Sequence, residues 1–225
     1  MAGLPTMSPV RALAIVAVAG LLASSVALAG GGDPQKRIEP ADQARARAML
    51  LRKTDLPGFR AERNTSGGDI DFACAALGES DLTLTGLADS PEFSAGPAFA
   101  SSEAQVYESV ADGSAAWTRD TSTAGIACLK STLRREFAKE GLTLLSFRKL
   151  AFPPVSQRSA AYRIALSGKS QGISVRVFFD AVVLLHSRAE VFLAVGSALV
   201  PPVKSVDVAL ARTLASRMKT AMRGA

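Results

Sequence analysis

His186 is the sole histidine of the 225-residue chain and the residue best suited to acid–base chemistry. In a hydrolase of the Ser-His-Asp type, a histidine serves as the general base for a serine nucleophile. A histidine activates a cysteine thiol in the same way if that cysteine stays unpaired. Because the pattern around His186 is that of a turn between two strands, we expect a solvent-exposed histidine and predict no catalytic residue. An exported hydrolase that uses His186 is the alternative.

Two further stretches have residue types that bind phosphate or metal ions. Residues 168–170 (GKS) resemble the end of a phosphate-binding loop, but Arg163 stands where that loop requires its first glycine, so we interpret the stretch as a hairpin turn. Four acidic residues could supply oxygen ligands to Ca²⁺: Asp69, Asp71, Glu79 and Asp81. Their spacing does not match an EF-hand loop, which favours a solvated acidic loop. We therefore predict no cofactor and no metal site.

The chain contains two cysteines, Cys74 and Cys128. Two cysteines and one histidine cannot provide the four ligands of a structural zinc site. In an oxidising compartment an even number of cysteines favours pairing. We therefore predict a disulfide between Cys74 and Cys128. It would close a loop of about 55 residues and stabilise the fold by roughly 4 kcal/mol in the chain-entropy model.

The first 29 residues have the organisation of a cleavable signal peptide. Arg11 provides a positive charge, an apolar stretch follows, and Ala27-Leu28-Ala29 has the small residues that signal peptidase requires. We predict cleavage after Ala29, which would leave a secreted or extracytoplasmic protein without a stable membrane span. An uncleaved anchor is the alternative, because residues 12–29 are uncharged and just long enough to span a bilayer.

Charged residues are segregated along the mature chain. Residues 30–63 hold 8 basic and 5 acidic side chains, residues 64–116 hold no basic and 9 acidic ones, and residues 117–225 hold 17 basic and 6 acidic ones. We expect the acidic and basic segments to face one another in the fold. The alternative is a charged surface that binds a partner. The basic excess alone does not indicate nucleic-acid binding, because aromatic residues do not alternate with basic ones on a predicted sheet.

Hydrophobic periodicity predicts the elements of the N-terminal half. Residues 30–40 are expected to form a flexible lead-in, and residues 41–225 a single domain that begins with an amphipathic helix over 41–53. Between residues 59 and 97 we expect loops with one short strand. A half-buried strand is predicted over 99–110.

A central helix is predicted over residues 113–140, broken around 121–125. A meander of strands should follow, over 142–152, 160–167, 173–185 and 190–200. The last helix is expected to have Ser205 as its N-cap and Asp207 in its first turn. This order predicts an α+β fold of the α/β/α sandwich type. Its antiparallel sheet of about five to six strands would be covered by an N-terminal, a central and a C-terminal helix.

The order of several short motifs resembles that of small exported actinobacterial proteins. The motifs are LRKTDLPGF over residues 51–59, Cys74, the stretch from Ala100-Ser101-Ser102 to Val106-Tyr107-Glu108-Ser109, and Cys128-Leu129. Proteins with this order include secreted lipoproteins with a PsbP-like fold and the extracytoplasmic sensor-like domains of serine/threonine kinases. The resemblance implies a curved antiparallel sheet in an α/β/α sandwich and a non-enzymatic role. This chain departs from those proteins because it has no lipobox, no kinase domain and only one pair of cysteines.

The sequence therefore predicts a secreted, non-catalytic binding or sensor-like module for a lipid, glycan or protein partner at the cell surface. An apolar-rich meander and the absence of recognisable catalytic machinery support this hypothesis. The alternatives are the hydrolase that uses His186 and a cell-surface protein that binds its partner through charge.

Overall fold

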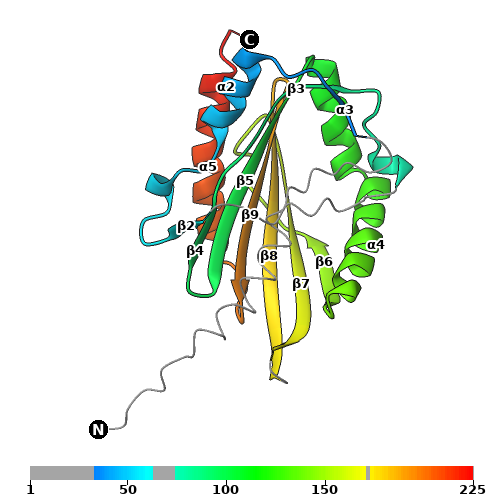
Figure 1. Cartoon of the computed structure of the whole chain (residues 1–225), viewed down its shortest axis with the longest axis vertical. Helices are drawn as coiled ribbons and strands as arrows, with labels where there is room; N and C mark the ends of the chain where they lie inside the picture. The colour runs from blue at the N-terminus through cyan, green and yellow to red at the C-terminus, as the bar shows by residue number, and fades with distance from the viewer. Residues whose placement is uncertain (1–32, 63–73, 171–172, 225) are drawn as a thin grey trace.

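The computed structural model describes residues 33–62, 74–170 and 173–224. The predicted signal peptide lies outside these residues. Within them the chain forms four α-helices and a sheet of nine strands (Figure 1). The fold is therefore α+β, as predicted, but the expected five to six strands were too few.

The sheet is built mainly from antiparallel pairs. Its strands are β1 (Gln35–Lys36), β2 (Arg60–Glu62), β3 (Thr83–Asp89), β4 (Glu92–Ala95), β5 (Ala98–Tyr107), β6 (Thr143–Lys149), β7 (Arg158–Ser170), β8 (Ile173–His186) and β9 (Ala189–Ala198). They are ordered β1-β3-β5-β9-β8-β7-β6, while β4 also pairs with β5, and β2 pairs with β4. Among these strands only β1 pairs in parallel, with β3. β5, β9, β8 and β7 thus lie inside the sheet, with neighbours on both sides.

Helices cover both faces of the sheet (Figure 1). They are α2 (Pro40–Met49), α3 (Val110–Thr121), α4 (Thr123–Lys139) and α5 (Lys204–Ala221), and there are short 3-10 turns η1 (Lys53–Asp55) and η2 (Ala75–Leu77). Helices α2 and α5 pack on one face, where Met49, Val191 and Leu214 are buried together. Helices α3 and α4 pack on the other face, where Leu133 and Phe179 are buried. None of the described helices has both the length and the apolarity needed to cross a membrane.

Residues 59–97 contain more regular structure than the sequence predicted. One short strand was expected, but this segment contributes β2, β3 and β4. Strand β3 has a weak apolar pattern because it carries small residues where α2 lies across it. A β-carbon on Gly86 would come within 2.4 Å of the Asp42 carbonyl oxygen, so the close packing of the helix requires glycine there. Residues 35–36, in the expected lead-in, pair with β3.

The remaining elements follow the predicted order, with changes at their ends. The central helix is broken at Ser122 into α3 and α4, and four strands follow as β6 to β9. The C-terminal helix begins at Lys204 with Val203 as N-cap, so the prediction of Ser205 was wrong. The helix starts directly after Pro201-Pro202, and no side chain caps it.

On the face covered by α2 and α5, arginine side chains form ion pairs with carboxylates and so connect neighbouring elements. Asp42 of α2 is 2% exposed and accepts hydrogen bonds from Arg188, at 2.7 and 2.9 Å, and from Thr85 and Arg45. Burial alone would raise the pKa of Asp42, but these hydrogen bonds hold that pKa well below its usual range. Two more carboxylates on this side pair in the same way: Asp55 with Arg217 and Asp180 with Arg163.

Candidate functional site

A crevice lies between the sheet and the helices α3 and α4. Its volume is about 90 Å³, which exceeds the roughly 10–15 Å³ that holds one water molecule. The crevice is therefore large enough for a small organic group. Most of its lining is apolar and includes Ile126, Leu129, Leu133, Phe147, Ile164 and Phe192.

The floor of the crevice is open to solvent in the middle of the sheet. Ala181 of β8 and Ala194 of β9 are register partners, and both are only half-buried. The residues that follow and precede them, Val182 and Leu193, point to the other face and are 1% exposed. Two adjacent alanines thus leave a hollow that α3 and α4 do not fill. Ligand sites are commonly concave, apolar and preformed in this way.

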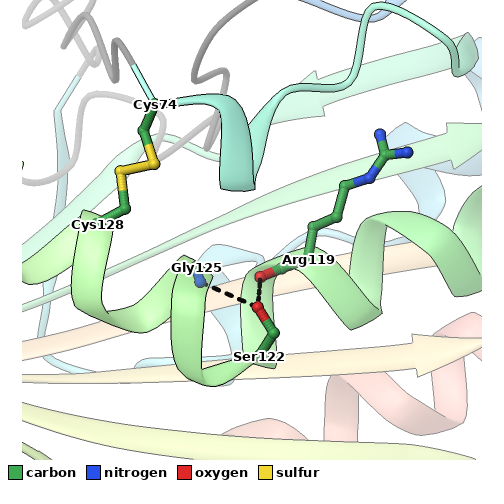
Figure 2. The surroundings of a disulfide bond; sticks show 5 residues. All are labelled: Cys74, Arg119, Ser122, Gly125 and Cys128. Atoms are coloured by element: carbon green, nitrogen blue, oxygen red, sulfur yellow. Dashed lines mark hydrogen bonds between the residues drawn. A yellow bond between two sulfur atoms is a disulfide. The ribbon is translucent and has the colours of Figure 1, made fainter.

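Ser122 forms the junction between α3 and α4 and caps the start of α4 (Figure 2). The Ser122 hydroxyl accepts a hydrogen bond from the Gly125 backbone N–H at 2.9 Å and donates one to the Arg119 carbonyl oxygen at 3.0 Å. A β-carbon on Gly125 would lie 1.9 Å from that carbonyl oxygen, so the tight junction requires glycine. The junction follows Asp120, which lies in the last turn of α3 and lines the crevice.

Cys74 and Cys128 form a disulfide close to the same junction (Figure 2). It joins the residue before η2 to α4. Leu77 of η2 is fully buried, in the same apolar cluster as Leu129 and Leu133 of α4. The disulfide therefore tethers the helix that covers the crevice, and it fits a protein of an oxidising, extracytoplasmic compartment.

Four carboxyl groups are buried on this side of the sheet. They belong to Glu79, Glu103, Asp120 and Glu190, each at most 5% exposed. Asp120 and Glu103 line the crevice. Glu190 of β9 is the register partner of Gln105 on β5. Within the described residues, Oδ1 of Asp120 and both carboxyl oxygens of Glu190 have no hydrogen-bond partner. Such groups are rare in folded proteins and call for an explanation.

Strand β5 supplies a chain of polar contacts beside these acids. The Tyr107 hydroxyl donates to Oε1 of Gln105 at 2.6 Å, and Nε2 of Gln105 donates to Oε1 of Glu103 at 2.6 Å. The carboxyl oxygens of Glu79 lie 3.3 and 3.4 Å from the Tyr107 hydroxyl oxygen. The alternating polar residues of β5 thus point under α3 and α4, and β5 is buried on both faces instead of half-buried as predicted.

Burial raises the pKa values of these carboxyl groups. It raises the pKa of Glu79 to about 7. Burial also raises the pKa of Asp120 well above its usual range, and the neighbouring charges of Glu79 and Glu103 add to the increase. The pKa of Glu190 is raised for the same reasons, with Asp120 as a neighbouring charge. The cluster can therefore hold protons at neutral pH, and a positively charged ligand would favour the loss of these protons to solvent.

His186 lies in a different place, at the end of β8 on the face covered by α5. It is half-buried beside a hollow that is also lined by Ser156, Gln157 and Lys219. The Ser156 hydroxyl donates to the Leu185 carbonyl oxygen at 2.9 Å. None of the described residues that line this hollow carries a carboxyl group. The geometry around His186 therefore lacks the third member of a Ser-His-Asp site.

Residues 168–172 read GKSQG, which matches the G-x-S-x-G pattern of a nucleophile elbow. An elbow joins a strand to a helix, whereas Gly168 to Ser170 belong to β7 and pair with β8. The predicted hairpin between these two strands is present, but strand pairing continues to Ser170, so residues 168–170 belong to β7 and not to the turn. Ser170 pairs with Ile173 at the start of the 14-residue β8, and His186 ends that strand. They are roughly 40 Å apart along it, too far for a catalytic pair.

Of the four acidic residues considered as calcium ligands, the structure describes only Glu79 and Asp81. Asp69 and Asp71 lie outside the described residues. Glu79 is buried beside Tyr107, so the expected solvated loop is wrong at this position, while Asp81 pairs with Arg119 at 2.7 Å. The described residues contain no group of three or more His, Cys, Asp or Glu side chains that could hold a metal ion.

Sequence reasoning did not identify Glu103, Asp120 or Glu190 as site residues. Two of them stand in unusual positions that could have been noticed. Asp120 lies in the last turn of a helix, where the helix dipole disfavours a carboxylate. Glu190 lies between Ala189 and Val191 in an otherwise apolar strand. Glu103 gave no such signal, because alternating polar residues also occur on solvent-exposed strands.

Comparison with known proteins adds no relative. No protein-family model matches this chain, and no curated protein matches it.

Proposed function

We propose that this chain is an extracytoplasmic, non-catalytic binding module that takes up a small, mainly apolar ligand in the crevice beneath α3 and α4. The observation that carries the proposal is the partly exposed floor at Ala181 and Ala194, in the centre of a sheet that is covered by helices on both faces. A fully packed core would bury these positions, as it buries Val182 and Leu193 on the other face.

The polar groups of the crevice favour a role in ligand binding over a purely structural role. Apolar ligand sites usually contain a few polar groups that orient the ligand. Asp120 is 4% exposed, lines the crevice, and leaves Oδ1 without a hydrogen-bond partner in the described residues. Leaving a buried polar atom unsatisfied costs roughly 1–3 kcal/mol. A ligand that hydrogen-bonds to Asp120 would remove this cost.

Binding of a small apolar probe tests the proposal. Titration of isotope-labelled protein with 1-hexanol, followed by NMR, should shift the backbone amide signals of β8, β9 and α4 in a saturable way. The variant Ala194→Leu places a larger side chain on the floor of the crevice and should weaken 1-hexanol binding by about tenfold or more. A titration without saturable shifts on these elements would contradict the proposal.

A matched substitution separates filling of the crevice from general disturbance of the sheet. Ala98 of β5 is also half-buried and does not line the crevice. Ala98→Leu adds the same side chain to the same sheet and should leave 1-hexanol binding unchanged. Equal losses in Ala194→Leu and Ala98→Leu would mean that the crevice is not the site.

The extracytoplasmic location is part of this proposal. The disulfide between Cys74 and Cys128 supports it, as does the organisation of residues 1–29. Expression of the full chain in a host that exports proteins should release a product whose first residue is Gly30, which N-terminal sequencing detects. Recovery of the intact chain from the membrane fraction would favour the uncleaved anchor.

A further inference from the structure

We propose that the ligand of the crevice carries an ammonium group, and that Asp120 binds this group while the apolar lining holds the rest of the molecule. The inference rests on the proposed function and adds the chemical class of the ligand. A small primary amine with a short hydrocarbon chain has this chemistry.

The Asp120 carboxyl group is buried at the crevice without a full set of hydrogen bonds from the described residues. It is 4% exposed, and its Oδ1 atom has no hydrogen-bond partner in the described residues. The adjacent Arg119 points to another partner, because its guanidinium binds the Asp81 carboxylate and the Gly78 carbonyl oxygen. Within the described residues, no arginine or lysine side chain lines the crevice. A cation that binds Asp120 must therefore come from outside this set of residues.

Other acidic side chains surround Asp120. Glu103 of β5 also lines the crevice, while Glu79 and Glu190 lie close enough to act on Asp120 or to be influenced by it. An ammonium group would be attracted by each carboxylate that forms, and a ligand carboxylate would be repelled. In a site of low dielectric these interactions are stronger than in water. The crevice thus selects against acidic lipids such as fatty acids.

A pair of aromatic rings also lines the crevice. Phe147 and Tyr162 both line the crevice, and their ring centroids lie 5.6 Å apart. The face of an aromatic ring attracts an ammonium group by roughly 0.5–2 kcal/mol, depending on how far the pair is removed from water. Aromatic rings and a carboxylate together are the usual elements of an ammonium site, whereas a purely apolar ligand needs only the rings.

The ionisable groups that face Asp120 make binding of an amine dependent on pH. They come from several elements around the crevice: Glu79 after η2, Asp89 of β3, Glu103 and Tyr107 of β5, Tyr162 of β7, Glu190 of β9 and Arg119 of α3. An ammonium group favours the ionised form of Asp120, so its binding should release protons from this cluster. The affinity for the amine should therefore rise as the pH rises through the raised pKa values of the cluster.

Three six-carbon probes that differ only in their head group test the inference: hexylamine, 1-hexanol and hexanoate. Isothermal titration calorimetry of the full mature chain should show the tightest binding for hexylamine, binding of 1-hexanol weaker by about tenfold, and no binding of hexanoate. Titration in buffers with different ionisation enthalpies should reveal proton release for hexylamine alone. Tighter binding of hexanoate, or equal binding of hexylamine and 1-hexanol, would overturn the inference.

The variant Asp120→Asn keeps the size of the side chain and removes its charge. It should weaken hexylamine binding by about tenfold or more and change 1-hexanol binding by less than about threefold, which also shows that the variant keeps its crevice. Unchanged hexylamine binding would overturn the inference while leaving the proposed function intact. If neither hexylamine nor 1-hexanol binds the unaltered protein, both the inference and the proposed function fail.

Discussion

Buried carboxyl groups occur on both faces of the sheet, but their surroundings differ. On the face covered by α2 and α5, Asp42 and the half-buried Asp55 are each bound by an arginine from a distant part of the chain, and Asp180 is bound by Arg163, its register partner on β7. On the face covered by α3 and α4, Asp120 and Glu190 have carboxyl oxygens without a hydrogen-bond partner in the described residues. The arginine–carboxylate pairs connect elements of the fold. The carboxyl oxygens of Asp120 and Glu190 that have no partner among the described residues can still accept hydrogen bonds.

Asp207 is an exception on the face covered by α2 and α5, because its pKa is raised. It lies in the first turn of α5 and is 1% exposed, and burial together with the neighbouring Asp180 raises its pKa to about 8. Its positive neighbour is Arg163, which already binds Asp180. Asp207 therefore belongs to an arginine-centred cluster, whereas Asp120 and Glu190 lie among other acids. An unpaired carboxyl group suggests a ligand when it also lines an accessible crevice, as Asp120 does.

Breaking an arginine contact on the α2–α5 face should have the largest effect. Arg188→Ala leaves Asp42 buried without its main cationic partner, and we expect a loss of about 3–5 kcal/mol in the free energy of unfolding. Urea denaturation followed by circular dichroism measures this change. Arg45 also binds Asp42 but is more exposed, so Arg45→Ala should cost less than about 1 kcal/mol. Similar small losses in both variants would contradict the structural role of Arg188.

Removing the disulfide should have the next largest effect, on the other face. The double variant Cys74→Ser, Cys128→Ser should lose about 2–4 kcal/mol in the free energy of unfolding, because the unfolded chain gains conformational freedom. Hydrogen exchange should speed up most in η2 and α4, the two elements that the disulfide joins. Uniformly faster exchange over the whole sheet would argue against a local role in covering the crevice.

Carboxyl groups with raised pKa values and those with lowered pKa values should make stability depend on pH in opposite directions. A raised folded-state pKa, as for Glu79 at about 7, means that its contribution to stability is fully present below the unfolded pKa near 4.5 and is lost as the pH rises through 7. The lowered pKa values of Asp42 and Asp55 mean that their contribution is lost in strong acid. We expect the free energy of unfolding to fall by on the order of 2 kcal/mol between pH 5 and pH 8.

Denaturation curves at several pH values test this prediction. In Glu79→Gln the fall between pH 5 and pH 8 should become shallower, whereas Glu140→Gln, which changes an exposed carboxyl group, should leave it unchanged. Stability that instead rises steadily from pH 5 to pH 8 would show that the acids beneath α3 and α4 are not protonated in the fold.

The smallest effect is expected for the fully buried Glu190. Burial raises the pKa of Glu190 well above its usual range, which favours the neutral carboxyl group, and Glu190→Gln matches this neutral group in size and charge. The free energy of unfolding at pH 7 should therefore change by less than about 1 kcal/mol. A loss comparable to that of Arg188→Ala would mean that Glu190 is ionised and has a partner like the carboxylates of the other face.

The sequence predicted much of the fold because its strongest patterns are local. Alternating apolar residues identified the strands that became β7, β8 and β9, and the break near Ser122 followed from residues that disfavour a continuous helix. The one short strand expected over residues 59–97 did not reveal the full length of β3, because Gly86 and its neighbours are shaped by contact with α2, a tertiary effect. The crevice could not be predicted either. Asp120 and Glu190 meet only after α3 folds onto β9, and the pairing of Ala181 with Ala194 depends on strand register.

A crystal structure of the mature protein with hexylamine bound tests the central claim most directly. The account predicts electron density for the alkyl chain between α4 and the floor formed by Ala181 and Ala194, with the amine nitrogen within hydrogen-bond distance of the Asp120 carboxyl group. A fully occupied hexylamine elsewhere on the protein, with the crevice closed by its own side chains, would contradict it.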